Sequence, residues 1–313
     1  MSKIESATAT SMGQEMSTGK GPRVWLDMDQ QELDDAYDQV CWAPNREHLQ
    51  KRRRVASEQT LARIGKPKRV AYGSTEIEKL DIYQSNRPNA PINIFIHGGA
   101  WRGGFAKDSA YMAEMYLAAG AHLVIPDFVW VQDAGGSLMT MADQVRRAVA
   151  WVYKNATSFG GDPNRLYISG HSSGGHLGGV VVITDWRKEH DLPPDIIKGA
   201  LLISGMYDLK PVRLSKRSKY VNFDDVTEET LSAQRHIDMI NMPLIIAHGT
   251  LESPEFQRQS RDFAAAVKAA GKPVEFIVGE GFNHFEMQET MGNPFGLGGR
   301  AALSMMKLKI GEA

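Results

Sequence analysis

The chain has 313 residues, of which 42% are hydrophobic and 23% are charged, and its formal net charge is −1. This balance is typical of a globular protein with a sizeable core, and a charge so close to zero gives no overall attraction for nucleic acid or an anionic membrane. The single cysteine, Cys41, excludes an internal disulfide and fits a reducing compartment. No apolar run is long enough to span a bilayer, so we expect a cytoplasmic protein.

Two N-terminal stretches are expected to lie outside the main fold. Residues 1–23 are rich in Ser, Thr, Gly and Met and lack the apolar core of a signal peptide, which predicts a flexible tail. Residues 24–64 have a polar helical pattern with too few apolar anchors for a core of their own, so they are predicted to dock as a helical segment over the active site. The basic run 51–54 within this segment is interpreted as a solvated face.

From residue 69 onward, apolar runs alternate with helical patterns. The expected strands are 69–72, 77–83, 92–96, 122–126, 166–168, 199–204, 243–247 and 274–278. The expected helices are 109–119, 139–153, one after Ser172, 254–270 and 297–308. Turns are expected at 73–74, as a hairpin, and at 162–164. Residues 211–236 have no clear period and predict a cap-like excursion above the sheet. The alternation predicts one α/β domain over 24–313, with a mostly parallel sheet of about eight strands covered by helices on both faces.

The segment around Ser172 carries the clearest chemical signal. Gly170-His171-Ser172-Ser173-Gly174 matches G-x-S-x-G between an apolar strand and a Gly-rich helical stretch, which is the context of a nucleophile elbow. The turn is so tight that side chains at positions 170 and 174 would collide with it, so glycine is required there. The alternative is an ordinary Gly-rich turn. The residues elsewhere in the chain that could serve as base, acid and oxyanion donors distinguish the two interpretations.

A serine nucleophile needs an imidazole base and a carboxylate that orients it, and in this arrangement the chain order is Ser, acid, His. His284, after the last strand, is the predicted base, because the other downstream histidines lie in helical or polar segments or precede the acid (His176, His190, His236 and His248). Glu252 is the predicted acid, since it is the only carboxylate between strand 243–247 and the following helix. Asp208, after the preceding strand, is the rival.

The developing oxyanion needs two N–H donors. One is predicted to be the amide of Ser173, and the other to come from the Gly98-Gly99 pair that follows strand 92–96. Four aromatic residues are candidates for an aromatic wall of the pocket: Trp101, Phe128, Trp130 and Tyr207. No set of side chains has the spacing of a metal site, and no cofactor is expected.

These motifs together resemble the arylformamidase (kynurenine formamidase) family, in the hormone-sensitive-lipase-like branch of the α/β-hydrolase superfamily. The matching segments are 97–101, 159–163, 170–177, 184–186, 204–209 and 252–260, followed by His284-Phe285. The Trp after the glycines, the pair Asp185-Trp186 and segment 252–260 point to the formamidase branch. Ser173 departs from the usual alanine, and residues 129–136 replace a familiar Tyr-x-Leu-Ala-Pro pattern.

The resemblance implies hydrolysis of an N-formyl arylamine such as N-formylkynurenine, through a Ser-Glu-His triad and an acyl-enzyme. The expected partner is therefore a small aromatic ester or amide. The alternative is a carboxylesterase or a hydrolase of a xenobiotic ester, amide or carbamate, because fold and triad do not set the leaving group. A non-catalytic receptor on the same scaffold is disfavoured because no triad member is missing. The oligomeric state, a homodimer included, stays open.

Overall fold

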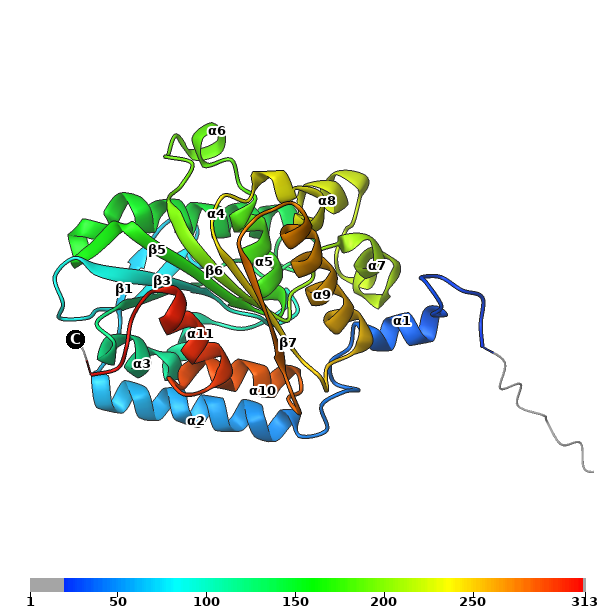
Figure 1. Cartoon of the computed structure of the whole chain (residues 1–313), viewed down its shortest axis with the longest axis horizontal. Helices are drawn as coiled ribbons and strands as arrows, with labels where there is room; N and C mark the ends of the chain where they lie inside the picture. Colours follow the sequence, from blue (N-terminus) through cyan, green and yellow to red (C-terminus); the bar gives the residue numbers. More distant parts are fainter. Residues whose placement is uncertain (1–19, 312–313) are drawn as a thin grey trace, which may run out of the picture.

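An eight-stranded sheet forms the centre of the protein in the computed structural model, which describes residues 20–311 (Figure 1). The strands lie in the order β1-β2-β4-β3-β5-β6-β7-β8. β1 and β2 form an antiparallel hairpin, β2 runs antiparallel to β4, and all the other neighbours are parallel. The mostly parallel sheet predicted from the alternation is thus confirmed. The strands are Lys68–Ala71 (β1), Lys79–Tyr83 (β2), Ala90–Ile96 (β3), His122–Pro126 (β4), Gly161–His171 (β5), Ile197–Ile203 (β6), Leu244–Gly249 (β7) and Val274–Gly279 (β8).

Helices cover both faces of this sheet (Figure 1). One face packs against Leu138–Asn155 (α4), Ser173–Val182 (α5) and Pro254–Ala269 (α9). The other face packs against Ala113–Ala118 (α3), His284–Glu289 (α10) and Leu297–Met305 (α11). The remaining α-helices are Gln30–Ala36 (α1), Arg46–Ile64 (α2), Trp186–His190 (α6), Leu209–Leu214 (α7) and Asp225–Thr230 (α8).

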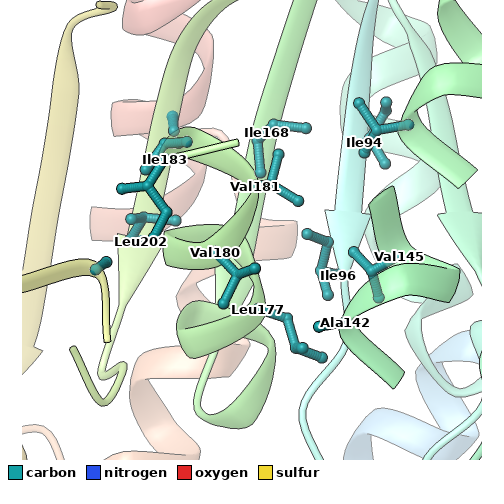
Figure 2. Packing of buried hydrophobic residues seen from close by; sticks show 14 of the residues in the cluster. Ile94, Ile96, Ala142, Val145, Ile168, Leu177, Val180, Val181, Ile183 and Leu202 are labelled. Carbon is teal, nitrogen blue, oxygen red and sulfur yellow. The ribbon is translucent and has the colours of Figure 1, made fainter. Parts of the chain in front are cut away.

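The two faces of the sheet follow from the two-residue period of its strands. On β3, Ile94 and Ile96 belong to the core beneath α4 and α5, whereas Phe95 between them belongs to the core beneath α3 and α11. Figure 2 shows the first of these cores, where the isoleucines of β3 pack against Val145 of α4 and Leu177 of α5. Each such side chain contributes roughly 1.5–3 kcal/mol when it is fully buried. The two packed layers hold the carboxyl ends of β3, β5, β6, β7 and β8 at one edge of the sheet.

Several local expectations are corrected by the structure. The helix expected at 109–119 divides into a 3-10 helix, Ala106–Met112, and α3. The turn expected at 162–164 lies inside β5, because the pairing of β5 with β3 continues to Gly161 through a register shift that absorbs the irregular residues. The excursion at 211–236 is mostly helical, with α7, α8 and two short 3-10 segments joined by bends.

The N-terminal segment forms two helices that pack on the main fold. α1 begins at a capping box in which Asp29 accepts from the amide of Glu32, and α2 runs along the face that carries α3 and α10 (Figure 1). The tail expected at 1–23 falls almost entirely outside the described residues. Within the described part of the chain, no helix has the combined length and apolarity needed to cross a membrane.

Candidate active site

Ser172 occupies a strained turn between β5 and α5. Its φ of 60° and ψ of −127° lie in a region that side chains rarely adopt, and the turn is held by the amide of Ser172, which donates to Ile203 O. A Cβ at Gly170 would lie 2.3 Å from Gly174 O, and one at Gly174 would lie 2.0 Å from Ile96 O. The requirement for glycine on both sides of the serine, predicted from the motif, is confirmed by these distances.

The three predicted residues of the acyl-transfer machinery lie together at the carboxyl edge of the sheet. Ser172 Oγ is 2.8 Å from His284 Nε2, and His284 Nδ1 is 2.7 Å from Glu252 Oε2. All three side chains are buried. His284 is the first residue of α10 rather than part of a loop, because Asn283 caps that helix in a box with Glu286. The Asn-x-x-Glu spacing is a capping signal that could have predicted the helix from the sequence.

The carboxylate of Glu252 is held from both sides. Oε1 accepts from Ser204 Oγ at 2.6 Å and from the amide of Gly249 at 2.7 Å, so it is Oε2 that is left to accept the Nδ1–H of His284. Asp208, the rival, instead caps α7 through the amide of Lys210 and pairs with Arg235 at 3.3 Å. The geometry therefore favours Glu252 and gives Asp208 a role in holding the local backbone.

His171, next to the nucleophile, holds the backbone of the predicted base. Its Nε2 donates to His284 O at 2.8 Å, and its ring lies 4.5 Å from the imidazole of His284. Burial, followed by the neighbouring charges of His284 and Arg53, holds the pKa of His171 well below its usual range. A neutral imidazole at this position can donate to the carbonyl without adding a second positive charge beside the base. This positioning contact was not anticipated from the sequence.

The glycine loop after β3 lies directly against the elbow. A Cβ on Gly98 would be 3.0 Å from Ser172 Cβ, so only glycine allows this approach. Within residues 20–311, the amides of Gly98 and Gly99 donate to no protein acceptor. The amide of Ser173 opens α5 and, like the first amides of any helix, has no partner within the helix. The loop is tied to the elbow by the amide of Trp101, which donates to Ser173 Oγ at 3.3 Å.

A cavity of about 680 Å³ opens over Ser172 and His284. Its walls come from the glycine loop, from residues 37–54 of the N-terminal segment and from residues 216–220 of the excursion. Seven cationic side chains line it against two acidic ones, Asp38 and Asp108. The cations are Arg46, Arg53, Arg54, Arg102, Lys216, Arg217 and Lys219. This is a strongly basic cavity in a chain whose net charge is −1.

Similarity to known proteins agrees with this geometry. The chain is 31% identical to the kynurenine formamidase of Danio rerio, over 85% of this chain and 93% of that protein, and 30% identical to that of Salmo salar, over 78% and 85%. The chain belongs to the kynurenine formamidase family. The family model BD-FAE matches residues 80–198. The fold is also that of esterase LipW from Mycobacterium marinum, with a TM-score of 0.66 and 18% identity over 86% of this chain and 89% of that one.

The predicted α/β-hydrolase fold and the predicted family are thereby confirmed. As a member of the kynurenine formamidase family, the chain is an enzyme of the serine-hydrolase type. The elbow and the glycine loop alone do not define a substrate, because one fold and one set of catalytic groups serve many reactions.

The four aromatic residues expected to wall the pocket of this formamidase-family protein do not line its cavity. Trp101 and Tyr207 are buried against His176 and Phe263, and Phe128 stacks on His97 at 4.4 Å. Trp130 is half-buried and donates from Nε1 to Gly104 O. Large aromatic rings bury more apolar area than other side chains, which explains why Trp101, Phe128 and Tyr207 belong to the core.

The aromatic residues that do line the cavity are Tyr37, Phe105, Tyr220 and Phe285. They come from segments far apart in the sequence that meet only in the folded chain, so no sequence pattern groups them as a pocket wall. Residues 129–136, which depart from the family pattern, buttress the glycine loop from behind. The amide of Val131, for example, donates to Trp101 O at 2.8 Å. Among the described residues, no group of three or more His, Cys, Asp or Glu side chains is arranged to hold a metal ion.

Proposed function

We propose that this protein hydrolyses aryl formamides of the N-formylkynurenine type, releasing formate and the free arylamine. The observation that carries the proposal is the identity of 31% to a kynurenine formamidase across nearly the whole of both chains. The hydrogen-bonded series Ser172, His284 and Glu252 supplies the machinery that such a reaction needs.

In the first step, Ser172 Oγ attacks the formyl carbon and His284 Nε2 takes the hydroxyl proton. The Nδ1–H of His284 donates to Glu252, which holds the ring in the correct tautomer and stabilises the imidazolium that forms. The carbonyl oxygen becomes an oxyanion, for which the unpartnered amides of the Gly98-Gly99 loop and of Ser173 are available donors.

The tetrahedral intermediate collapses when its carbon–nitrogen bond breaks. His284 delivers its proton to the departing nitrogen, so that a neutral arylamine leaves and Ser172 carries the formyl group as an ester. Water then attacks this ester while His284 takes one of its protons. The second collapse returns that proton to Ser172 and releases formate.

A carboxylesterase is the second candidate, because the fold is shared with an esterase and the same triad would serve an alcohol leaving group. A paired steady-state assay of the full-length protein on N-formylkynurenine and on p-nitrophenyl acetate separates the two, with Ser172→Ala as the blank. A far higher kcat/KM on the formamide is expected. Good turnover of the ester with little formamide hydrolysis would assign the protein to the esterases, and substantial residual activity in the Ser172→Ala variant would refute the nucleophile assignment.

A further inference from the structure

Arg217 is a buried cation with no acidic partner. The residue is 5% exposed, and no carboxylate of residues 20–311 lies within ion-pair distance of it. The carboxylate of Asp38, although close enough to feel the charge of Arg217, forms its ion pair with Lys216 at 2.6 Å. A charged group is costly to bury unless another charge compensates it, so an arginine in this state is a candidate for a partner that arrives from outside.

The guanidinium of Arg217 is oriented by contacts that leave part of it free. Nη2 donates to Tyr37 O at 3.0 Å, Nη1 donates to Tyr220 Oη at 3.2 Å, and the group lies 5.2 Å from the ring of Trp101. Two of its five N–H donors are thereby used, and the buried Nε has no hydrogen-bond partner in the protein. Because Arg217 lines the same cavity as Ser172 and His284, a molecule bound there can contact its side chain.

A second unpaired cation converges on the same spot. Arg102, which is exposed, stacks its guanidinium over the ring of Tyr220 at 4.1 Å and makes no ion pair with any described residue. Tyr220 is therefore placed between the two arginines, with its hydroxyl on Arg217 and its ring face on Arg102. The hydroxyl accepts from Arg217, so its own proton is available to an anion.

We propose that Arg217, Arg102 and Tyr220 form a subsite for a carboxylate on the leaving group of the substrate. A planar guanidinium with unused N–H donors can hold a carboxylate through charge-assisted hydrogen bonds. In a formamide the acyl carbon carries only hydrogen, so the anionic group can belong only to the arylamine half. The preferred substrates are thus N-formyl arylamines that bear a carboxylate, and neutral formanilides or simple neutral esters are poor ones. This specificity rests on the proposed function.

The test compares N-formylkynurenine with its carboxamide, which has nearly the same size and lacks the negative charge. For the wild-type protein, kcat/KM should be about 10- to 100-fold higher on the carboxylate, the range expected for one charge-assisted hydrogen-bonded contact. Arg217→Met should remove this preference through KM, with kcat within about threefold, and should leave turnover of the carboxamide nearly unchanged. Arg217→Lys keeps the positive charge but loses the planar set of N–H donors, so it should recover only part of the preference.

Arg52→Met is the matched control for the loss of one positive charge nearby, because Arg52 pairs with Glu289 and does not line the cavity. It should behave as the wild type. Arg102→Met changes an exposed side chain, so it tests the subsite even if Arg217→Met fails to fold, and a loss of about 2- to 5-fold confined to the carboxylate is expected. Equal losses on carboxylate and carboxamide, or a wild type that does not distinguish them, would overturn the subsite.

Binding separates the subsite from the proposed reaction. Calorimetric titration of kynurenine and of kynurenine amide into the Ser172→Ala variant, with and without Arg217→Met, requires no turnover. Tighter binding of the carboxylate that disappears with Arg217→Met would support the subsite even if no formamide were hydrolysed. Formamide hydrolysis without any discrimination in binding would leave the proposed function standing and refute the subsite alone.

Discussion

Replacing Glu252 by glutamine tests the tautomer that the geometry assigns to His284. The amide of Gly249 is a fixed donor to Oε1, so the carbonyl oxygen of the new side chain should face it, and the NH₂ group would then face Nδ1 of His284. Nδ1 must become an acceptor, which moves the ring proton to Nε2 and removes the acceptor for Ser172. In the opposite orientation the NH₂ group would face the N–H of Gly249, so two donors would meet. Leaving a buried donor without an acceptor costs roughly 1–3 kcal/mol.

The first orientation gives His284 the wrong tautomer, and the second keeps the tautomer but lacks the negative charge that stabilises the imidazolium. We therefore expect kcat to fall about 1,000- to 10,000-fold, equivalent to about 4–5.5 kcal/mol in the activation barrier. Asp208→Asn is the matched control, because that carboxylate caps α7 and pairs with Arg235 instead of contacting His284. Its kcat should stay within about threefold of the wild type. Steady-state kinetics of both variants on the better substrate, with circular dichroism to verify folding, make the comparison. A loss below tenfold for Glu252→Gln, or an equal loss for Asp208→Asn, would refute this reasoning.

Three further substitutions probe buried polar groups. Ser173→Ala removes the acceptor for the amide of Trp101, and should lower kcat about 3- to 10-fold through a loosened glycine loop. Ser260→Ala is the control, because it removes a buried hydroxyl that has no protein partner, and it should leave kcat unchanged. Steady-state kinetics of the two variants show whether the contact between Trp101 and Ser173 supports catalysis. Burial, opposed by a hydrogen bond to Leu231 O, lowers the pKa of His176 to about 3. Below pH 6.5 the imidazole is therefore protonated in the unfolded chain but stays neutral in the folded chain. The free energy of unfolding must then fall as the pH falls, and His176→Gln, which keeps a donor and an acceptor, should reduce the loss between pH 6 and pH 4 by about 2 kcal/mol in urea titrations. Parallel pH profiles for the two proteins would contradict the assignment.

The positions of the proposed triad residues could be predicted because each follows an apolar strand in the sequence. Ser172, Glu252 and His284 come directly after β5, β7 and β8, and the carboxyl ends of neighbouring parallel strands must meet at one edge of the sheet. The tight approach of the elbow and the glycine loop also leaves a local signal, since only glycine fits there. The roles we assign to these residues remain predictions until the variants are measured.

The walls of the cavity could not be predicted in the same way. Arg217 lies in the run Lys216-Arg217-Ser218-Lys219, whose composition is that of a solvated face, and Arg53 lies in a similar basic run on α2. Both become buried only because segments distant in the sequence close over them, Tyr37 over Arg217 and Phe285 beside Arg53. The aromatic residues were misplaced for the converse reason, since a ring that could line a pocket gains more free energy by filling the core.

Burying Arg53 and Arg217 without a carboxylate partner costs stability. We therefore infer that these arginines serve to bind a ligand in the cavity rather than to stabilise the fold. Arg53 is 9% exposed and, like Arg217, has no carboxylate partner among the described residues, and burial lowers its pKa. Replacing such groups by apolar side chains is often neutral or stabilising in proteins, so stability alone gives no reason to keep them. They lie in the N-terminal segment and in the excursion, outside the sheet that carries the nucleophile and its partners. Charge selectivity can therefore change on this fold without any change in Ser172, Glu252 or His284.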